Sequence, residues 1–195
     1  MLKKIVMTVL TGLGVLCVAG SSGVAKAPQG WKLKGNAPKS YETGLDSSVK
    51  HSGKSSGYLR AKATWKTGFG TLMQVIRSDN YKGKRVRLSA WVKTKNIVWW
   101  SGLWMRVDGK KRKILAFDNM QRRPIRGTTS WTKYSVVLDV APQSTGIAFG
   151  ILLAGKGQVW LDDLKFEIVG SDVPTTDQLS PKLPKTPQNI GFEKK

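Results

Sequence analysis

The sequence predicts an all-β fold, an antiparallel β-sandwich of the jelly-roll type. Three observations support this prediction. Alternation of apolar and polar residues with a period of two recurs along the chain, whereas no helical period of 3.6 does. Turn signals rich in Gly, Ser, Asn and Pro separate the alternating segments. Roughly seven to nine short strands with this punctuation are typical of sandwiches and jelly rolls, and the length predicts one domain.

The first predicted strands are "SGYLRAKATW" and "GTLMQVIR", and "KRVRLSAWVKT" and "GLWMRVD" follow. In the last two, apolar residues share one face, which we expect to point toward the core. These residues are Val86, Leu88, Ala90 and Val92, then Leu103, Met105 and Val107. The opposite face then carries Trp91 in one strand and Trp104, Arg106 and Asp108 in the other.

Three further segments complete the predicted sandwich. "KYSVVLDVA" alternates like the earlier strands, whereas "GIAFGILLAG" and "QVWLDDLKFEIVG" are apolar enough to predict strands buried on both faces. After Gly170 the alternation stops, and a segment containing several Pro and Lys residues runs to the end of the sequence. The sequence therefore predicts a sandwich over 28–170 and a flexible tail over 171–195.

The first residues predict export. Lys3 and Lys4 precede the apolar run "IVMTVLTGLGVLCVAG", and small residues around Ala25 suit a cleavage site, with Ala27 as an alternative. The run is shorter than the ~20 apolar residues that a membrane span needs. We expect a signal peptide over 1–25, no transmembrane segment in the mature chain, and a secreted or cell-envelope location. Cleavage also removes Cys17, the single cysteine, so no disulfide is expected.

The chain is strongly basic, with 33 Lys and Arg against 12 Asp and Glu and a net charge of +21. Such a field concentrates anionic polymers near the surface. For an exported protein these are wall polymers, acidic polysaccharides or lipid headgroups. Aromatic residues among basic ones also suit single-stranded nucleic acid, but the sequence carries no RNA-binding signature, and no specific nucleic-acid partner is expected. Solubility is the alternative explanation of the charge.

Several stretches resemble a known family. The turn His51–Ser56 and the closing "GQVWLDDLKFEIVG" are similar to those of carbohydrate-binding-module type, galactose-binding-like β-sandwich domains. The region between them resembles a bacterial subfamily that is often found beside helix-turn-helix regulator domains. The resemblance covers about Gly30 to Gly170. It implies a jelly roll, a sugar ligand and a structural role for His51. The predicted signal peptide in place of a DNA-binding partner departs from that arrangement.

The sequence favours no enzymatic chemistry. His51 is the only histidine, no "H-E-x-x-H" zinc motif occurs, and carboxylates are few. No catalytic residue and no cofactor is predicted. The resemblance implies one metal candidate, a structural calcium at Asp163, to which Glu42 or Asp46 could add oxygen ligands. Asp162 and Asp163 should point to opposite sides of their strand. The alternative is that the inward Asp accepts hydrogen bonds from a neighbouring loop.

The outward tryptophans define the predicted ligand site. Aromatic rings on an exposed sheet face can stack against sugar rings while polar neighbours bond the hydroxyl groups. The predicted ligand-binding residues are Trp91, Trp104, Arg106, Asp118, Asn119 and Gln74. In the alternative interpretation, Asp118 and Asn119 satisfy a loop backbone and Arg106 pairs with Asp118.

The remaining tryptophans are assigned other roles. Trp99 and Trp100 are expected in a loop at the rim of the sandwich, just before a strand. The other four are assigned to packing. They are Trp31, Trp65, Trp131 and Trp160.

From these patterns the expected function is a secreted, non-catalytic binding module for carbohydrate, with anionic or wall-associated glycans as one class of ligand. The alternative is a basic, envelope-associated structural or interaction protein. Charge alone would hold such a protein to anionic polymers or to the membrane surface.

Overall fold

The computed structural model describes residues 26–179, 187, 189–191 and 193. The predicted signal peptide over 1–25 lies outside these residues, as does most of the tail beyond Leu179. Helical structure in the described part is confined to three-residue 3-10 turns, and none of them could span a membrane.

Nine strands make up the described fold, and every pairing between them is antiparallel. The strands are β1 (Lys32–Gly35), β2 (Tyr41–Asp46), β3 (Ser56–Ala61), β4 (Phe69–Arg77), β5 (Lys84–Gly109), β6 (Ile114–Asp118), β7 (Ile125–Val140), β8 (Ser144–Ala154) and β9 (Gln158–Val169). The 3-10 turns are η1 (Pro38–Ser40), η2 (Asp79–Tyr81) and η3 (Lys110–Arg112). The prediction of an all-β antiparallel fold is confirmed.

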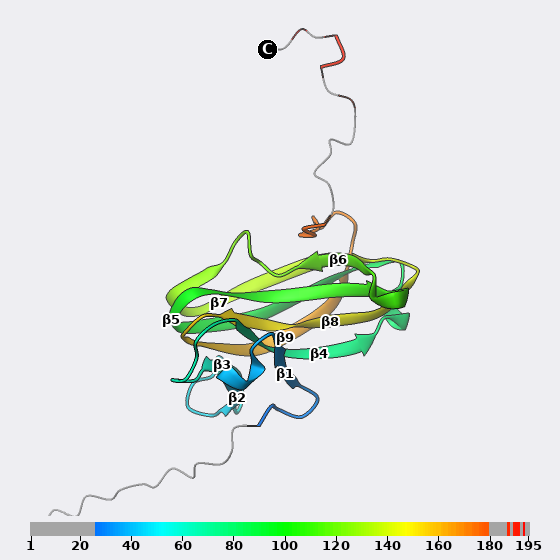
Figure 1. Cartoon of the computed structure of the whole chain (residues 1–195). Coiled ribbons are helices and arrows are strands. Elements are labelled where there is room, and N and C mark those ends of the chain that lie inside the picture. Colours follow the sequence, from blue (N-terminus) through cyan, green and yellow to red (C-terminus); the bar gives the residue numbers. More distant parts are fainter. Residues whose placement is uncertain (1–25, 180–186, 188, 192, 194–195) are drawn as a thin grey trace, which may run out of the picture.

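The strands form two layers that share the long strand β5 (Figure 1). The first part of β5 pairs with β7 and β9, and its last part pairs with β6 and β8. One layer therefore has the order β1-β4-β8-β5-β6, and the other has the order β7-β5-β9-β3-β2. Shifts in the β5–β7 register lie between Val92 and Ser101, where β5 passes from one layer to the other.

Trp99 and Trp100 lie in this crossing segment of β5, which corrects the prediction that they occupy a loop. Trp100 pairs with Ala154 of β8, and Ile97 pairs with Gly127 of β7. Backbone pairing thus continues through the segment, although its alternation is irregular. Because of this irregularity, a search for alternation with a period of two does not identify the segment as part of a strand.

The core lies between the layers and follows the predicted alternation. The seven apolar residues predicted to point inward from β5 are all 0% exposed: Val86, Leu88, Ala90, Val92, Leu103, Met105 and Val107. Of the tryptophans assigned to packing, Trp160 is buried, and Trp31 and Trp65 pack against this core. Trp131 contacts the His51 ring edge-on.

Strand β8 has large side chains on its inner face and mostly small residues on its outer face. Its inner face carries Ile147, Phe149, Ile151 and Leu153, which belong to the core. The outer face carries Gly146, Ala148 and Gly150, followed by Leu152 of the outer cluster. The neighbouring strands present Met73 and Trp104 at the level of Gly150, because these residues are paired in register. The outer surface is therefore low along β8 and high on both sides.

The chain after β9 begins by packing on the sandwich, which differs from the predicted flexible tail starting at Ser171. The Thr176 backbone N–H donates to the Val137 carbonyl at 2.8 Å. The Gln178 N–H donates to the Phe117 carbonyl, also at 2.8 Å. Residues 171–179 thus cover the space between β6 and β7. Alternation in the sequence cannot predict such a segment, because the segment is attached to the sheet edge by single backbone hydrogen bonds and not by a regular strand pairing.

The small outward residues of β8 lead to a prediction about stability. A Cβ atom at Gly150 would lie 2.1 Å from the Leu72 carbonyl oxygen, whereas one at Gly146 would lie 3.4 Å from the Ile76 carbonyl oxygen. Gly150→Ala should lower the free energy of unfolding by about 1–3 kcal/mol, because the β4 backbone must shift. Gly146→Ala is the matched control and should leave it nearly unchanged. Urea unfolding of both variants measures the difference, and equal stabilities would contradict the close approach.

Candidate functional site

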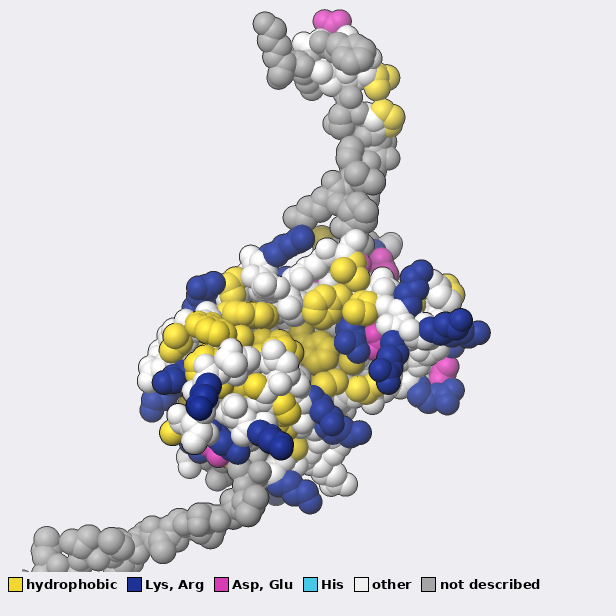
Figure 2. Space-filling model, viewed as in Figure 1, with side chains coloured by type: hydrophobic (Ala, Val, Ile, Leu, Met, Phe, Trp, Pro, Cys, Tyr) yellow, Lys and Arg dark blue, Asp and Glu magenta, His cyan; other side chains and the backbone are white. Residues whose placement is uncertain are grey.

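A trough runs across the outer face of the layer β1-β4-β8-β5-β6. It consists of two hollows that meet at Arg106, which lines both. The smaller hollow, of about 350 Å³, lies over the middle of the layer, and the larger, of about 1100 Å³, lies where β4, β5 and β8 approach the β5–β6 hairpin. Figure 2 shows hydrophobic side chains gathered over the middle of this face, with Lys and Arg side chains along its borders.

Trp104 forms the floor of the smaller hollow. It points away from the main core, as predicted, and belongs to a second apolar cluster on the outer face. Its indole is nevertheless only 7% exposed. Its Nε1–H donates to Thr71 Oγ1 at 2.8 Å, and that hydroxyl donates to the Ile151 carbonyl at 2.8 Å. Trp104 is thus a fixed floor rather than a freely exposed stacking platform.

Partly exposed apolar side chains surround this floor. Phe69 and Met73 come from β4 and Phe117 comes from β6, and all three pack against the Trp104 cluster. Polar groups stand at the edges, with Lys34 on β1 and Asn119 after β6. An apolar floor with a few polar groups at its rim is the usual composition of a small-molecule site.

Phe117 and Met73 were not among the predicted ligand residues, although their positions in the sequence indicated the correct face. Phe117 immediately precedes Asp118, and Met73 immediately precedes Gln74. Because side chains alternate along a strand, choosing the polar residue of each pair selected the wrong face. Asp118 is opposite Met105, and Gln74 is opposite Phe149, so both lie on the inner side of the layer.

Arg106 lies in the trough, as expected from its position beside Trp104, but its partner differs from the one considered. It binds Asp108 through two hydrogen bonds, from Nε at 2.8 Å and from Nη2 at 2.9 Å. The pairing with Asp118 that the sequence suggested does not occur, because Arg106 and Asp118 lie on opposite faces of the layer. The Arg106 side chain is 38% exposed, and its Nη1 has no protein partner among the described residues.

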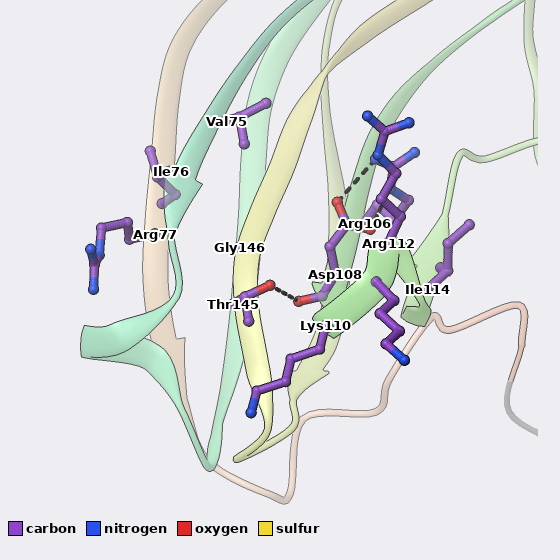
Figure 3. A pocket seen from close by; sticks show the side chains of 12 residues that line it. Val75, Ile76, Arg77, Arg106, Asp108, Lys110, Arg112, Ile114, Thr145 and Gly146 are labelled. Carbon is purple, nitrogen blue, oxygen red and sulfur yellow. Dashed lines mark hydrogen bonds and ion pairs between the residues drawn. The ribbon is translucent and has the colours of Figure 1, made fainter.

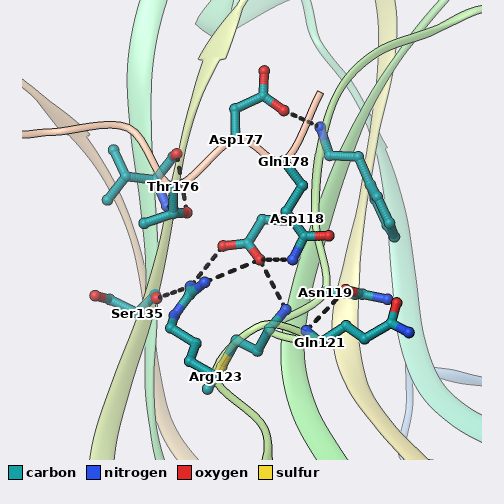
Figure 4. Close-up of polar contacts among 11 residues, drawn as sticks. Asp118, Asn119, Gln121, Arg123, Ser135, Thr176, Asp177 and Gln178 are labelled. Atoms are coloured by element: carbon teal, nitrogen blue, oxygen red, sulfur yellow. Dashed lines mark hydrogen bonds and ion pairs between the residues drawn. The ribbon is translucent and has the colours of Figure 1, made fainter. Parts of the chain in front are cut away.

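Asp118 is a scaffold residue. Its carboxylate is 0% exposed and accepts hydrogen bonds from Arg123, the Met120 N–H and the Gln178 amide (Figure 4). The alternative interpretation, in which Asp118 satisfies a loop, describes this geometry. Its neighbour Asn119 lines the trough while its Oδ1 accepts the Gln121 N–H.

Gln74 also lies away from the trough. It is on the inner face of β4 and lies close to Gly30 of the N-terminal segment. A Cβ atom added to Gly30 would be 3.8 Å from Gln74 Nε2. Of the six predicted ligand residues, the structure therefore brings together Trp104, Arg106 and Asn119.

Trp91 is on the other layer, far from Trp104 in the fold. Its ring stacks on the His51 ring, with centroids 4.1 Å apart and planes inclined by 14°. The two tryptophans face opposite sides of the sandwich, because β5 crosses between the layers in the segment that separates them.

The turn containing His51 is held by both aspartates of β9. Asp162 accepts the N–H groups of His51 and Ser52, and Asp163 accepts the Ser52 hydroxyl and pairs with His51 Nδ1 at 2.6 Å. The expectation that the two carboxylates point to opposite sides is wrong. Asp163 has a positive φ of 47°, and the β5–β9 register shifts between Ser89 and Trp91. This bulge brings both carboxylates to one turn.

The other carboxylates predicted as calcium ligands also have protein partners. Glu42 pairs with Arg60, and Asp46 accepts the Trp160 indole N–H at 2.9 Å. Within the described residues, no group of three or more His, Cys, Asp or Glu is arranged to hold a metal ion. The alternative of hydrogen bonds from a neighbouring loop describes Asp162 and Asp163.

The burial of Trp104 generates a prediction about stability. Trp104→Ala should lower the free energy of unfolding by about 3–5 kcal/mol, because it leaves a cavity in the outer cluster. Trp104→Phe keeps most of the ring and removes the bond to Thr71, so the loss should be about 1–2 kcal/mol. Urea unfolding measures both. Wild-type stability of Trp104→Ala would mean that the indole is an open surface.

The His51 turn generates a pH prediction. Hydrogen bonds from Ser52 and His51 hold the pKa of Asp163 below its ordinary value of 3.8. A lowered folded-state pKa contributes stability above the unfolded pKa, and this contribution is lost as the pH falls through the folded pKa. Asp163→Asn should therefore flatten the stability curve below about pH 4. Thermal unfolding from about pH 5 to pH 2 tests this, and identical slopes for both proteins would contradict it.

Comparison with known proteins agrees with this architecture, although no protein-family model matches the chain. The sequence is 45% identical over 174 residues to the Uncharacterized HTH-type transcriptional regulator YbfP of Bacillus subtilis (strain 168). That alignment covers 88% of this chain and 59% of the relative. The chain thus spans less than two thirds of the length of the curated relative that it matches.

Solved structures share the fold at low sequence identity. The C-terminal family 22 carbohydrate binding module of Clostridium thermocellum Xyn10B matches with a TM-score of 0.54 at 10% identity, over 75% of this chain and 89% of that one. The CBM22-1 xylan-binding domain of Paenibacillus barcinonensis Xyn10C matches with a TM-score of 0.52 at 17% identity, over 73% and 88%. The expected resemblance to carbohydrate-binding-module sandwiches and to a subfamily beside helix-turn-helix regulators is confirmed, and the chain has the β-sandwich fold of family 22 modules.

Proposed function

We propose that this protein is a non-catalytic carbohydrate-binding module whose ligand lies in the trough above Trp104. The observation that carries the proposal is the trough itself, an apolar floor with polar groups at its edges. The apolar faces of sugar rings would pack on Phe117 and Met73, and hydroxyl groups would bond Asn119 and Arg106. Xylan-binding domains with the same sandwich fold support a sugar ligand.

The trough suits an extended chain better than a single sugar. One hollow lies above Trp104 and the other beside the β5–β6 hairpin, and Arg106 lines both. Gly146 lines the hairpin hollow and, having no side chain, leaves room there for a ligand. A ligand several sugar units long could contact both hollows at once.

The trough is poor in groups for catalysis. The only carboxylate that lines either hollow among the described residues is Asp108, and Arg106 engages both of its oxygens. A glycosidase ordinarily needs two carboxyl groups flanking the scissile bond. Binding without hydrolysis is the function that these groups support. The signal-like segment over 1–25 leads us to propose that binding takes place outside the cytoplasm or in the cell envelope.

The net charge of +21 favours a second candidate function. In that case the protein is a basic component of the envelope, held to anionic polymers or the membrane surface by charge alone. Attraction of this kind is screened as salt rises, since the Debye length falls from ~10 Å at 0.1 M to ~3 Å at 1 M. Contacts on an apolar floor depend much less on salt.

Removing the floor of the trough tests the first candidate. The double variant Met73→Ala/Phe117→Ala should weaken binding to xylan or to another retained glycan by roughly tenfold or more, about 1.4 kcal/mol. Affinity electrophoresis in gels containing soluble polysaccharides measures this at about 0.1 M and about 0.5 M salt, on either side of strong screening. Trp131→Ala, which removes an aromatic residue from the other layer, is the matched control.

The two candidates predict different results. Retention that survives the higher salt and is lost in the double variant supports a carbohydrate module. Retention that disappears at the higher salt and is equal in all variants would support the charged envelope protein. Urea unfolding checks that the double variant remains folded.

A further inference from the structure

We propose that the trough selects an acidic polysaccharide, with the hollow beside the β5–β6 hairpin binding its negatively charged groups. This inference rests on the proposed function, since it assigns the charge of the ligand that the trough holds. The hairpin joins β5 to β6 through Lys110, Lys111, Arg112 and Lys113, and the first three line the hollow.

The hairpin hollow adjoins the hollow above Trp104 at Arg106, which lines both. Figure 3 shows Arg106, Asp108 and Ile114 on the β5–β6 side and Val75 on the β4 side, with Gly146 of β8 between them. Gly146 has no side chain to fill this space. A sugar chain lying over Trp104 would reach the hairpin past Arg106, which borders both hollows.

The charges around this hollow are unbalanced. Arg77 pairs with Asp79, and Arg106 pairs with Asp108. The three hairpin cations that line the hollow have no acidic partner among the described residues, and all three are exposed. They are Lys110, Lys111 and Arg112. An anionic ligand would supply the missing counter-charges.

The apolar part of the hollow points to a sugar rather than to a small free anion. Val75 is 63% exposed and Ile114 is 45% exposed, on opposite sides of the trough. These side chains offer contact to the apolar faces of sugar rings. Cations and apolar surface together match a chain of rings that carry carboxylate or phosphate groups.

The hairpin backbone adds a second observation. Lys111 and Arg112 have φ values of 53° and 59°, in the left-handed region. Glycine adopts this region without cost, whereas residues with a Cβ atom are disfavoured there. Two consecutive cationic side chains thus occupy positions at which the fold alone would favour glycine.

The test compares a pair of ligands that differ only in charge and adds a third with another anionic group and another backbone. Glucuronoxylan and its carboxyl-reduced form share a backbone, and wall teichoic acid offers phosphate in place of carboxylate. The triple variant Lys110→Gln/Lys111→Gln/Arg112→Gln should bind the better acidic ligand roughly tenfold more weakly, the combined effect of three exposed ionic contacts. Its affinity for carboxyl-reduced xylan should not change. Isothermal titration with the full mature protein measures both, and the preferred acidic ligand identifies the anionic group.

A second triple variant controls for net charge. Lys84→Gln/Lys133→Gln/Lys165→Gln removes the same number of charges from exposed positions on the other layer. Wild-type binding of the acidic ligand by this control supports the hairpin site. The proposal would be overturned if both triple variants weakened binding of the acidic ligand equally, or if neither variant weakened it. Failure of the proposed function looks different, because the wild type would then bind no glycan through the Met73 and Phe117 floor.

A third variant separates folding from binding. Lys111→Gly/Arg112→Gly relieves the left-handed backbone, so its unfolding midpoint should equal or exceed that of the wild type. Its affinity for the acidic glycan should nevertheless fall several-fold, because two cations are lost. Unchanged affinity in this stable variant would overturn the proposal.

Discussion

The crossing of β5 from one layer to the other is the constraint on which the rest of the structure depends. One continuous strand pairs with β7 and β9 in its first part and with β6 and β8 in its last. The inward residues of both parts therefore enter the same core. The outward residues separate, so that Trp91 faces one side of the sandwich and Trp104 the other. The trough is built on the second side alone.

The trough itself results from a difference in side-chain size between neighbouring strands. Strand β8 carries Gly146, Ala148 and Gly150 outward, between Met73 of β4 and Trp104 of β5. Its inward residues are large and anchor it in the core. A strand can be central to the fold and still form the lowest part of a surface. The same arrangement explains why Trp104 is buried, since Gly150 has no side chain and the indole can reach past β8 to donate to Thr71 of β4.

Several carboxylates in this fold hold loops in place. Asp118 fixes the chain after β6 and the segment around Gln178, and Asp162 and Asp163 fix the His51 turn. In each case N–H or O–H donors occupy the oxygens. Burial of a charged group is costly unless such partners are present. This is why polar residues that stand out in an apolar strand proved to be scaffolding, and why Phe117 beside Asp118 lines the trough.

The sequence by itself determined the antiparallel β class, the inward faces of β5 and the outward direction of Trp104, because alternation along a strand is a local property. It also indicated the resemblance to carbohydrate-binding sandwiches. Only the tertiary structure decided that Trp91 and Trp104 lie on different faces and that Asp162 and Asp163 hold the same turn. These features depend on strand register, on the bulge at Asp163 and on the crossing of β5. Each of them is set by pairing between segments distant in sequence, which no local pattern records.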